Sequence, residues 1–183
     1  IDLSSAPERV VRYFAQRLCL AIFAAQEHKL KLICEKLQLE PGQRVLDLGC
    51  GWGGFARYAA ENYGVEVLGI TVSAQQQRYA QGLSLDLPVR TVLADYRTPL
   101  LRQEKAFDRI VSIGMMEHVG PKNYETFFDK CISLLKPDGM MLHHTIASNL
   151  SKEVTDQFFD RYIFPGGVLP SLKYFLLKLL LIV

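Results

Sequence analysis

The sequence of 183 residues predicts one α/β domain with a mostly parallel sheet and helices on both of its faces. Short apolar segments that fit buried strands alternate with segments in which apolar residues recur every three or four positions, and this alternation builds parallel sheets with crossover helices. A glycine-rich segment also follows the first of these strands. Apolar residues make up 49% of the chain, which is enough to fill the core of one domain.

The elements can be predicted in chain order. Residues 10–39 combine apolar positions at helical spacing with basic residues between them, which indicates one or two amphipathic helices, and Pro41-Gly42 ends this region. Ser73 is expected to cap the helix that follows it. The sequence predicts strands at 44–48, 65–70, 89–93, 107–113 and 140–145, helices at 55–63, 73–82, 124–135 and 154–162, a turn at 136–139 and a loop at 164–167.

Composition and charge exclude several classes of function. The net charge is only +2 and the charges are evenly spread, which does not fit a nucleic-acid surface. The four cysteines have neither CxxC spacing nor paired histidines, so we expect no metal site, no disulfide framework and a cytoplasmic protein with reduced thiols. The first 25 residues lack the features of a secretory signal, and the apolar run at 172–183 is shorter than the ~20 residues that span a bilayer.

The glycine-rich segment 49–54 (GCGWGG) lies in the expected turn between the first strand and the next helix. Glycine there lets a ligand approach the main chain at a helix N-terminus. The spacing also fits a dinucleotide site, but the second strand ends at Thr71 without the acidic residue that would bind a ribose. A tight turn that needs glycine only for packing is the third interpretation. Asp47, two residues before the first glycine, gives the D-x-G-x-G pattern of S-adenosylmethionine-dependent methyltransferases, and this pattern favours adenosylmethionine.

Five segments extend this resemblance to one family. They are 45–54 (VLDLGCGWGG), 69–76 (GITVSAQQ), 108–124 (DRIVSIGMMEHVGPKNY), 142–146 (LHHTI) and 162–170 (YIFPGGVLP). Together they closely resemble the cyclopropane-fatty-acyl-phospholipid synthases, which include the mycolic acid cyclopropane synthases, over roughly residues 26–172. The resemblance implies a Rossmann-like class I methyltransferase fold. Coclaurine-type N-methyltransferases look similar in the first half and are the nearest alternative.

The resemblance implies that S-adenosylmethionine binds at the carboxyl ends of the strands. Thr71 and Gln76 can bind hydroxyl groups without a charge, and the Tyr96 ring offers an apolar face to a base, although an ordinary strand-end aromatic is the alternative. The Cys50 thiol is expected to be a filler and not a nucleophile. The implied cofactor residues are Val45, Leu46, Asp47, Leu48, Gly49, Cys50, Gly51, Trp52 and Gly53 in the loop, Thr71, Val72, Ser73 and Gln76 near the ribose and adenosine, and Asp95 and Tyr96 beside the adenine.

The resemblance also implies the reaction. A methyl group passes from the sulfonium to a carbon of a cis double bond in a phospholipid acyl chain, and a base then removes a proton so that the ring closes. In the family this base is a bound bicarbonate, and the matching positions here are Glu117, His144 and the backbone of Ile146. Strand alternation sends His143 and His144 to opposite faces, and the resemblance selects His144. We expect His118 to be a loop residue that braces Glu117.

The chain departs from the family at both ends. The YSCAYF segment that precedes the long helix in the family is absent, and the family continues beyond the YIFPGG segment. We therefore expect residues 1–183 to form a single domain that is truncated at its C-terminal end. Its parts are N-terminal helices (1–40), a cofactor-binding core (41–148) and a partial substrate-side segment (149–183).

The implied partner is unsaturated phospholipid, which a cytoplasmic protein would contact peripherally at the inner membrane surface. Two alternatives stay open. One is a related methyltransferase that acts on an olefin or an amine without ring closure. The other is a cofactor-binding remnant without turnover.

Overall fold

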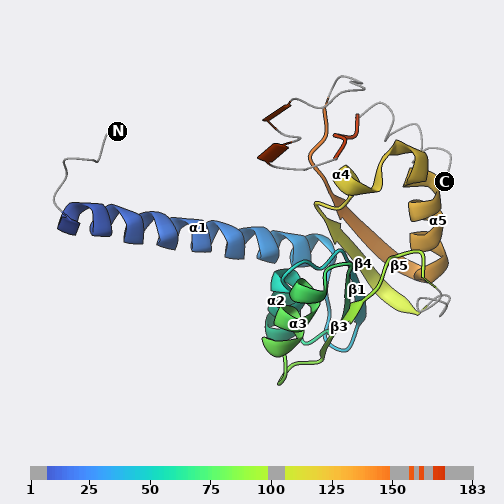
Figure 1. Ribbon diagram of the computed structural model, residues 1–183. Coiled ribbons are helices and arrows are strands. Elements are labelled where there is room, and N and C mark those ends of the chain that lie inside the picture. Colours follow the sequence, from blue (N-terminus) through green and yellow to red (C-terminus); the bar gives the residue numbers. More distant parts are fainter. Residues whose placement is uncertain (1–7, 99–105, 149–156, 159–160, 163–166, 172–183) are drawn as a thin grey trace.

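The computed structural model describes residues 8–98, 106–148, 157–158, 161–162 and 167–171. Five strands form one sheet, in which every neighbouring pair is parallel and the order is β3-β2-β1-β4-β5 (Figure 1). The order reverses beside β1, and open parallel sheets bind ligands at such a point. The predicted parallel sheet is therefore confirmed. The strands are β1 (Arg44–Leu48), β2 (Glu66–Thr71), β3 (Val89–Leu93), β4 (Phe107–Ile113) and β5 (Leu135–His144).

Helices cover both faces of the sheet, as the alternating sequence pattern predicts. Helices α2 and α3 lie on one face and α5 lies on the other (Figure 1). The N-terminal region forms one continuous helix, α1, and the predicted helix at 154–162 and loop at 164–167 fall mostly outside the described residues. The helices are α1 (Glu8–Lys36), α2 (Gly54–Tyr63), α3 (Ala74–Gly82), α4 (Met116–Val119) and α5 (Tyr124–Leu134), with a 3-10 turn, η2 (Pro121–Asn123), before α5.

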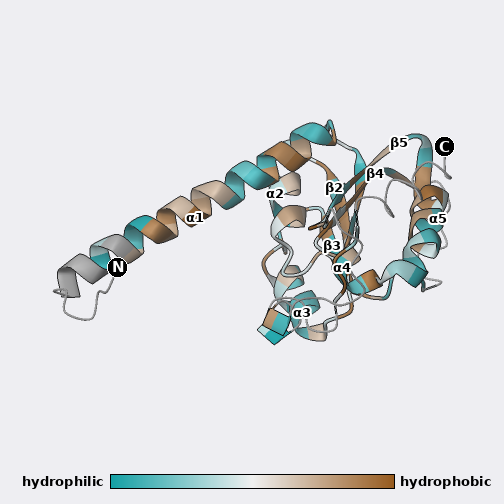
Figure 2. Ribbon diagram, turned by 90° about the horizontal axis from the view of Figure 1, so that it is seen from above, coloured by the Kyte–Doolittle hydropathy of each residue, from teal (hydrophilic) through white to brown (hydrophobic). Residues whose placement is uncertain are grey.

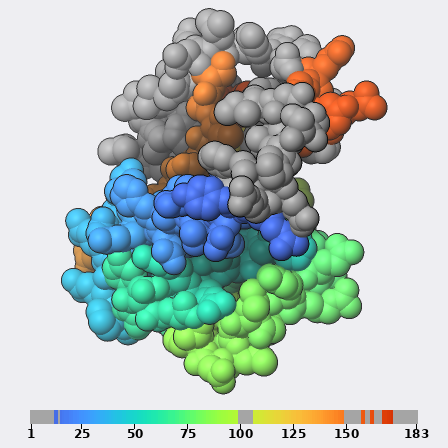
Figure 3. All heavy atoms as spheres, turned by 90° about the vertical axis from the view of Figure 1, so that its left-hand side faces the viewer, coloured from blue at the N-terminus to red at the C-terminus, as the bar shows by residue number. Residues whose placement is uncertain are grey.

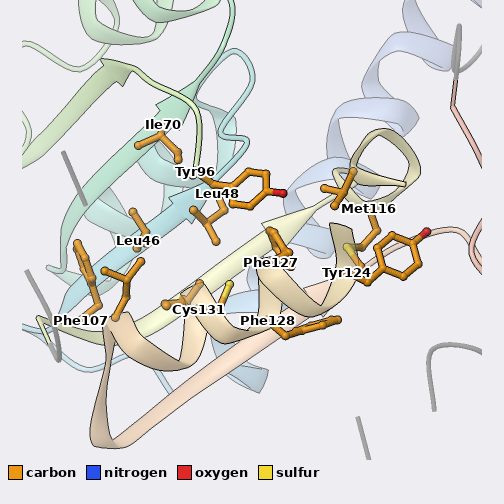
Figure 4. Packing of buried hydrophobic residues seen from close by; sticks show 13 residues of the cluster. Leu46, Leu48, Ile70, Tyr96, Phe107, Met116, Tyr124, Phe127, Phe128 and Cys131 are labelled. Carbon is orange, nitrogen blue, oxygen red and sulfur yellow. The ribbon is translucent and has the colours of Figure 1, made fainter. Parts of the chain in front are cut away.

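The two faces of the sheet hold separate hydrophobic clusters. Because side chains alternate along a strand, Val45 of β1 joins the cluster beneath α1 and α2, whereas Leu46 and Leu48 join the cluster beneath α5. Figure 4 shows the second cluster, in which the side chain of Phe127 extends from α5 into the space between this helix and the sheet. The carboxyl end of β1 is thus fixed from both sides.

The sequence prediction of a turn at residues 136–139 is wrong, because these residues lie inside β5. Phe107 of β4 pairs with Leu135 and Arg109 pairs with Met140, so the segment between the two pairs forms a bulge in the strand. Lys136 Nζ lies 2.7 Å from Asp108 Oδ1 and holds the bulge against β4. The Lys-Pro-Asp-Gly sequence does bend the chain, but the pairing of the residues on both sides makes the bend an irregularity within one strand.

The four cysteines are free thiols, of which Cys19 is exposed and Cys34, Cys50 and Cys131 are buried. Cys19 and Cys34 both lie in α1, but only Cys34 belongs to a hydrophobic cluster, as does Cys131 of α5, and Cys50 is buried in the glycine-rich loop.

Candidate functional site

A cavity of about 520 Å³ lies at the carboxyl ends of β1, β2 and β4. Its volume falls in the range of small-molecule sites, ~300–1,000 Å³. It lies at the point where the strand order reverses, which is where the fold class places its ligands. The cavity is lined by Gly49, Gly51, Ile70, Thr71, Val72, Gln76, Ala94, Asp95, Tyr96, Arg97, Ile113, Gly114, Met115, His118, Val119 and Asn123.

The glycine-rich loop between β1 and α2 forms one wall of the cavity. The amides of Gly49 and Cys50 both donate to the carbonyl of Ile70, at 3.0 and 2.9 Å, and this anchors the loop to the end of β2. Gly51 has a φ of 55°, and a Cβ added there would meet no atom within 4 Å, so its main chain is open to a ligand. Gly53 has a different role, because a Cβ there would lie 2.7 Å from the Cβ of Ala80 in α3.

Asp47 lies two residues before this loop and is 2% exposed. Its Oδ2 atom has no hydrogen-bond partner among the described residues, and burial raises the pKa of the carboxyl group to about 7. Buried acceptors without a partner are rare in folded proteins, so this oxygen needs a donor from a ligand or from water. Asp47 lies in β1 and is not among the residues that line the cavity.

A hydrogen-bonded network at the end of β2 forms a second part of the cavity wall. The Thr71 hydroxyl donates to Oε1 of Gln76 at 2.8 Å, and the Ser73 amide donates to the same hydroxyl at 3.2 Å. The Ser73 side chain accepts a bond from the Gln76 amide at 3.3 Å, which confirms that Ser73 caps α3. Thr71 and Gln76 line the cavity, whereas Ser73 holds them in place.

Tyr96 and its neighbours close the cavity beyond β3. Tyr96 is 7% exposed and packs edge to face on Phe127, with the ring centroids 5.3 Å apart (Figure 4). Asp95 accepts bonds from Nε and Nη2 of Arg97, at 2.8 and 2.7 Å, and these bonds hold the pKa of its carboxyl group below the ordinary value. The carboxylate predicted to contact adenine is therefore already paired with Arg97, and Arg97 itself lines the cavity.

Glu117 of α4 is 1% exposed, and two of its atoms are bonded to segments distant in sequence. Its Oε1 accepts the amide of Ile146 at 2.7 Å, and its main-chain carbonyl accepts the amide of Val168 at 2.8 Å. Its Oε2 has no hydrogen-bond partner among the described residues. The structure thus brings together Glu117 and the Ile146 backbone, as the sequence predicts. His118 is exposed, lies in α4 and not in a loop, and lines the cavity.

The two adjacent histidines of β5 lie on opposite faces of the sheet, as strand alternation requires. The His143 ring lies between Phe127 and Phe128 of α5, at centroid distances of 6.1 and 5.9 Å. Burial lowers the pKa of His143 to about 4, and the nearby Glu117 partly opposes this shift. His144 is exposed and its carbonyl accepts the amide of Gly114. Neither histidine lines the cavity, and His143 is the one on the side of α5.

The residues of the candidate site fall into three groups. The first group was predicted and lines the cavity, the second was predicted but does not line it, and sequence reasoning missed a third group, which lies at the end of β4 and just after it. The order of the sheet could have indicated this third group, because β4 lies beside β1. The first group is Gly49, Gly51, Thr71, Val72, Gln76, Asp95 and Tyr96, the second is Val45, Leu46, Asp47, Leu48, Cys50, Trp52, Gly53 and Ser73, and the third is Ile113, Gly114, Met115 and Val119.

The parallel sheet and the cavity at its switch point define the class: this is a domain with the fold of the S-adenosylmethionine-dependent methyltransferases. The chain belongs to the mycolic acid cyclopropane synthetase family, whose model matches residues 12–177. The cyclopropane-fatty-acyl-phospholipid synthase of Escherichia coli (strain K12) is 54% identical over 150 residues, which cover 82% of this chain and 38% of that protein. The resemblance inferred from the sequence is therefore confirmed, and this chain spans well under half of that relative.

Two solved structures support the same assignment. Mycolic acid cyclopropane synthase CmaA1, complexed with SAH and CTAB, matches with a TM-score of 0.72 and 36% identity, over 85% of this chain and 59% of the other. Coclaurine N-methyltransferase, bound to N-methylheliamine and SAH, matches with a TM-score of 0.68 and 33% identity, over 82% of this chain and 47% of the other. The fold is thus shared with an enzyme that is named as an N-methyltransferase. The family model and the E. coli relative are instead named for cyclopropane synthesis.

Proposed function

We propose that this chain binds S-adenosylmethionine in the cavity and transfers a methylene group to the cis double bond of an unsaturated phospholipid acyl chain, which forms a cyclopropane. The observation that carries the proposal is the cavity itself, which lies at the switch point of the sheet and against a glycine loop with an open main chain at Gly51. Membership of the family supplies the reaction class. The core at 41–148 would bind the cofactor, and residues 149–183 would belong to the substrate side.

The residues present fit this cofactor. The open main chain at Gly51 would lie against the cofactor, and Thr71 and Gln76, which are already oriented by their mutual hydrogen bond, would bind the ribose hydroxyl groups. Tyr96 would present its ring to the adenine, and the paired Asp95 and Arg97 would border the same base. The bound cofactor supplies an electrophilic methyl group on a sulfonium. The protein's part is to orient this group and to exclude water.

Glu117, Ile146 and His144 are the proposed catalytic residues. A bicarbonate ion has one O–H donor, and Oε2 of Glu117 is a buried acceptor that has no partner among the described residues, so the two fit. Bound there, the ion would supply the base for the proton that leaves during ring closure. The Ile146 amide already donates to Oε1 of Glu117, and would hold the carboxylate in place. His144 is exposed two residues before Ile146, and we propose it as the third member of the set.

The substrate would be reached from a membrane surface. No helix among the described segments is long and apolar enough to cross a bilayer. We propose that the chain contacts the inner membrane surface peripherally, from the cytoplasm, and takes an acyl chain from it.

The test is a product assay with methyl-labelled S-adenosylmethionine and vesicles of cis-unsaturated phospholipid. We expect the label in a cyclopropane acyl chain after the lipid is hydrolysed. If the label is found only in a small amine, the lipid proposal is overturned. If the label is found in a methylated acyl chain without a ring, the reaction is limited to methyl transfer.

A cofactor-binding remnant without turnover is the second candidate, and it is favoured by the observation that neither Glu117 nor His144 is among the residues that line the cavity. Calorimetry with S-adenosylhomocysteine separates the two. Binding without any transfer to lipid supports the remnant, whereas the absence of binding contradicts both candidates.

A further inference from the structure

The middle of α1 carries an exposed apolar segment, which we define as residues 18–25 (LCLAIFAA). Every residue of this apolar segment is exposed, including Leu18 at 63%, Leu20 at 59%, Ile22 at 51% and Phe23 at 69%. It contains no charged residue. Figure 2 shows it as a mostly apolar middle portion of α1, outside the body of the domain.

The apolar segment lies past the edge of the sheet at which the cavity opens. Among the described residues, the last part of α1 packs on the body through Ile33 and Cys34, which share a cluster with Phe55 of α2. Figures 1 and 2 both show α1 running away from the body on the side to which the strands point. The cavity lies at the carboxyl ends of the same strands. In Figure 3, which looks toward the first half of α1, the described part of this helix lies across the face of the molecule above α2 and α3.

The distribution of side chains around the helix indicates what covers the segment. At 100° per residue, large apolar side chains point over more than half of the circumference, and alanines occupy the rest. A single partner helix would cover only one stripe of such a surface, whereas the boundary between headgroups and hydrocarbon can cover a broad apolar face of a helix that lies in its plane. Eight residues extend ~12 Å, which is less than the ~30 Å needed to span a bilayer, so the segment would lie in this boundary.

The charges beside the apolar segment fit anionic headgroups. Arg17 comes directly before it, and Lys29 and Lys31 follow it within two turns. Between residues 12 and 36 the basic residues outnumber the acidic ones, which are Glu27 and Glu35. Long basic side chains can bury their aliphatic stems in apolar surroundings while their charges reach the headgroup layer.

We infer that the apolar segment of α1 docks this chain on an anionic phospholipid bilayer. Ile22 and Phe23 enter the boundary of the hydrocarbon, and Arg17 and Lys29 meet the headgroups. The inference rests on the proposed function, because it places the mouth of the cavity and the lipid substrate on the same side of the molecule.

Vesicle sedimentation with the full chain tests this docking surface. We expect binding to vesicles of equal parts phosphatidylglycerol and phosphatidylcholine, and a loss of at least tenfold in affinity for the double variant Ile22→Ser with Phe23→Ser. Leu85→Ser is the matched control, because Leu85 is 75% exposed and lies outside α1, and it should leave binding unchanged. A second variant, Arg17→Gln with Lys29→Gln, should weaken binding to these vesicles and reduce its salt dependence.

Equal binding by the wild type and the Ile22/Phe23 variant, with circular dichroism showing that both are folded, overturns the inference. The inference also fails if the variant abolishes a concentration-dependent dimer in sedimentation velocity while vesicle binding persists, because the occupant is then a second copy of the chain. The variant should still transfer methylene groups to detergent-dispersed phospholipid. If the wild type makes no product but binds vesicles as expected, the proposed function fails and the docking surface stands.

Discussion

The main-chain amide of Ile146 donates a 2.7 Å hydrogen bond to Oε1 of Glu117, and this bond joins the segment after β5 to helix α4. It satisfies one oxygen of a carboxyl group that is 1% exposed and leaves the other without a partner among the described residues. The bond therefore fixes the orientation of Glu117, and the second oxygen is the atom that can accept a bond from a ligand.

Glu117→Gln should abolish product formation while leaving cofactor affinity nearly unchanged. Glutamine keeps an oxygen for the Ile146 amide but loses the negative charge, so we expect the turnover rate to fall about a hundredfold or more. Labelled-product assays and calorimetry with S-adenosylhomocysteine measure the two effects. Glu40→Gln, at an exposed position before β1, is the control and should change neither. A large loss of affinity in Glu117→Gln would contradict the assigned role.

Asp47→Asn should stabilise the chain increasingly as the pH rises. Burial raises the pKa of this carboxyl group from 3.8 to about 7, so the folded state binds the proton more tightly than the unfolded state. The stability of the wild type therefore falls as the pH rises from about 4 to 7, by at most about 4 kcal/mol, and asparagine removes this dependence. Urea unfolding at pH 4, 6 and 8 measures the slope. The same difference between Asp47→Asn and wild type at all three pH values would refute the prediction, and Asp86→Asn serves as the exposed control.

His143→Leu should make the chain more resistant to acid. Burial lowers the pKa of His143 from 6.5 to about 4, so the unfolded state takes up the proton first. The stability due to the neutral ring is complete above pH 6.5 and is lost as the pH falls toward 4, by at most about 3 kcal/mol. Leucine does not titrate and can pack against Phe127 and Phe128. Thermal unfolding from pH 7 to 4 should show a flatter profile for the variant, whereas His28→Gln, at an exposed position of α1, should follow the wild type.

Gly53→Ala should destabilise the domain, whereas Gly54→Ala should not. Gly53 has a φ of 82°, and an added Cβ would lie 2.7 Å from the Cβ of Ala80. Backbone strain and the clash together should cost about 2 kcal/mol. Gly54 opens α2 and an added Cβ there meets no atom within 4 Å, so alanine should be neutral or slightly stabilising. Equal melting temperatures for the two variants would be inconsistent with the close approach of α2 and α3.

Sequence patterns predicted most of the sheet and its longer helices, because each buried strand is a short aliphatic run and the longer helices have recognisable boundaries, whereas the four-residue helix α4 was expected to be a loop. Ser73 is one such boundary, and its predicted capping bond is present. The turn predicted at 136–139 failed for a physical reason. Proline and glycine signal a bend, but they do not indicate that Leu135 and Met140 both pair with β4. Such pairing between distant segments is set by tertiary structure and not by local preference.

The site residues were predictable where the residue type at one position determines its chemical role. They were less predictable where tertiary packing determines how a side chain is paired or oriented. The glycine loop, Thr71 and Gln76 follow from the strand ends that precede them. The bond between Arg97 and Asp95 could not be inferred, because a nearby opposite charge does not establish a two-point contact. The positions of His143 and His144 follow from alternation only after the face covered by α5 is known.

The four thiols of the chain differ sharply in reactivity, because thiolates and not thiols react with alkylating reagents. Burial raises the pKa of Cys34, Cys50 and Cys131 to about 12, whereas Cys19 is exposed within the apolar segment of α1. A maleimide fluorophore should therefore attach to Cys19 without any mutagenesis. The native sequence thus provides an attachment point for a fluorescent reporter within the apolar segment, where contact with lipid is proposed.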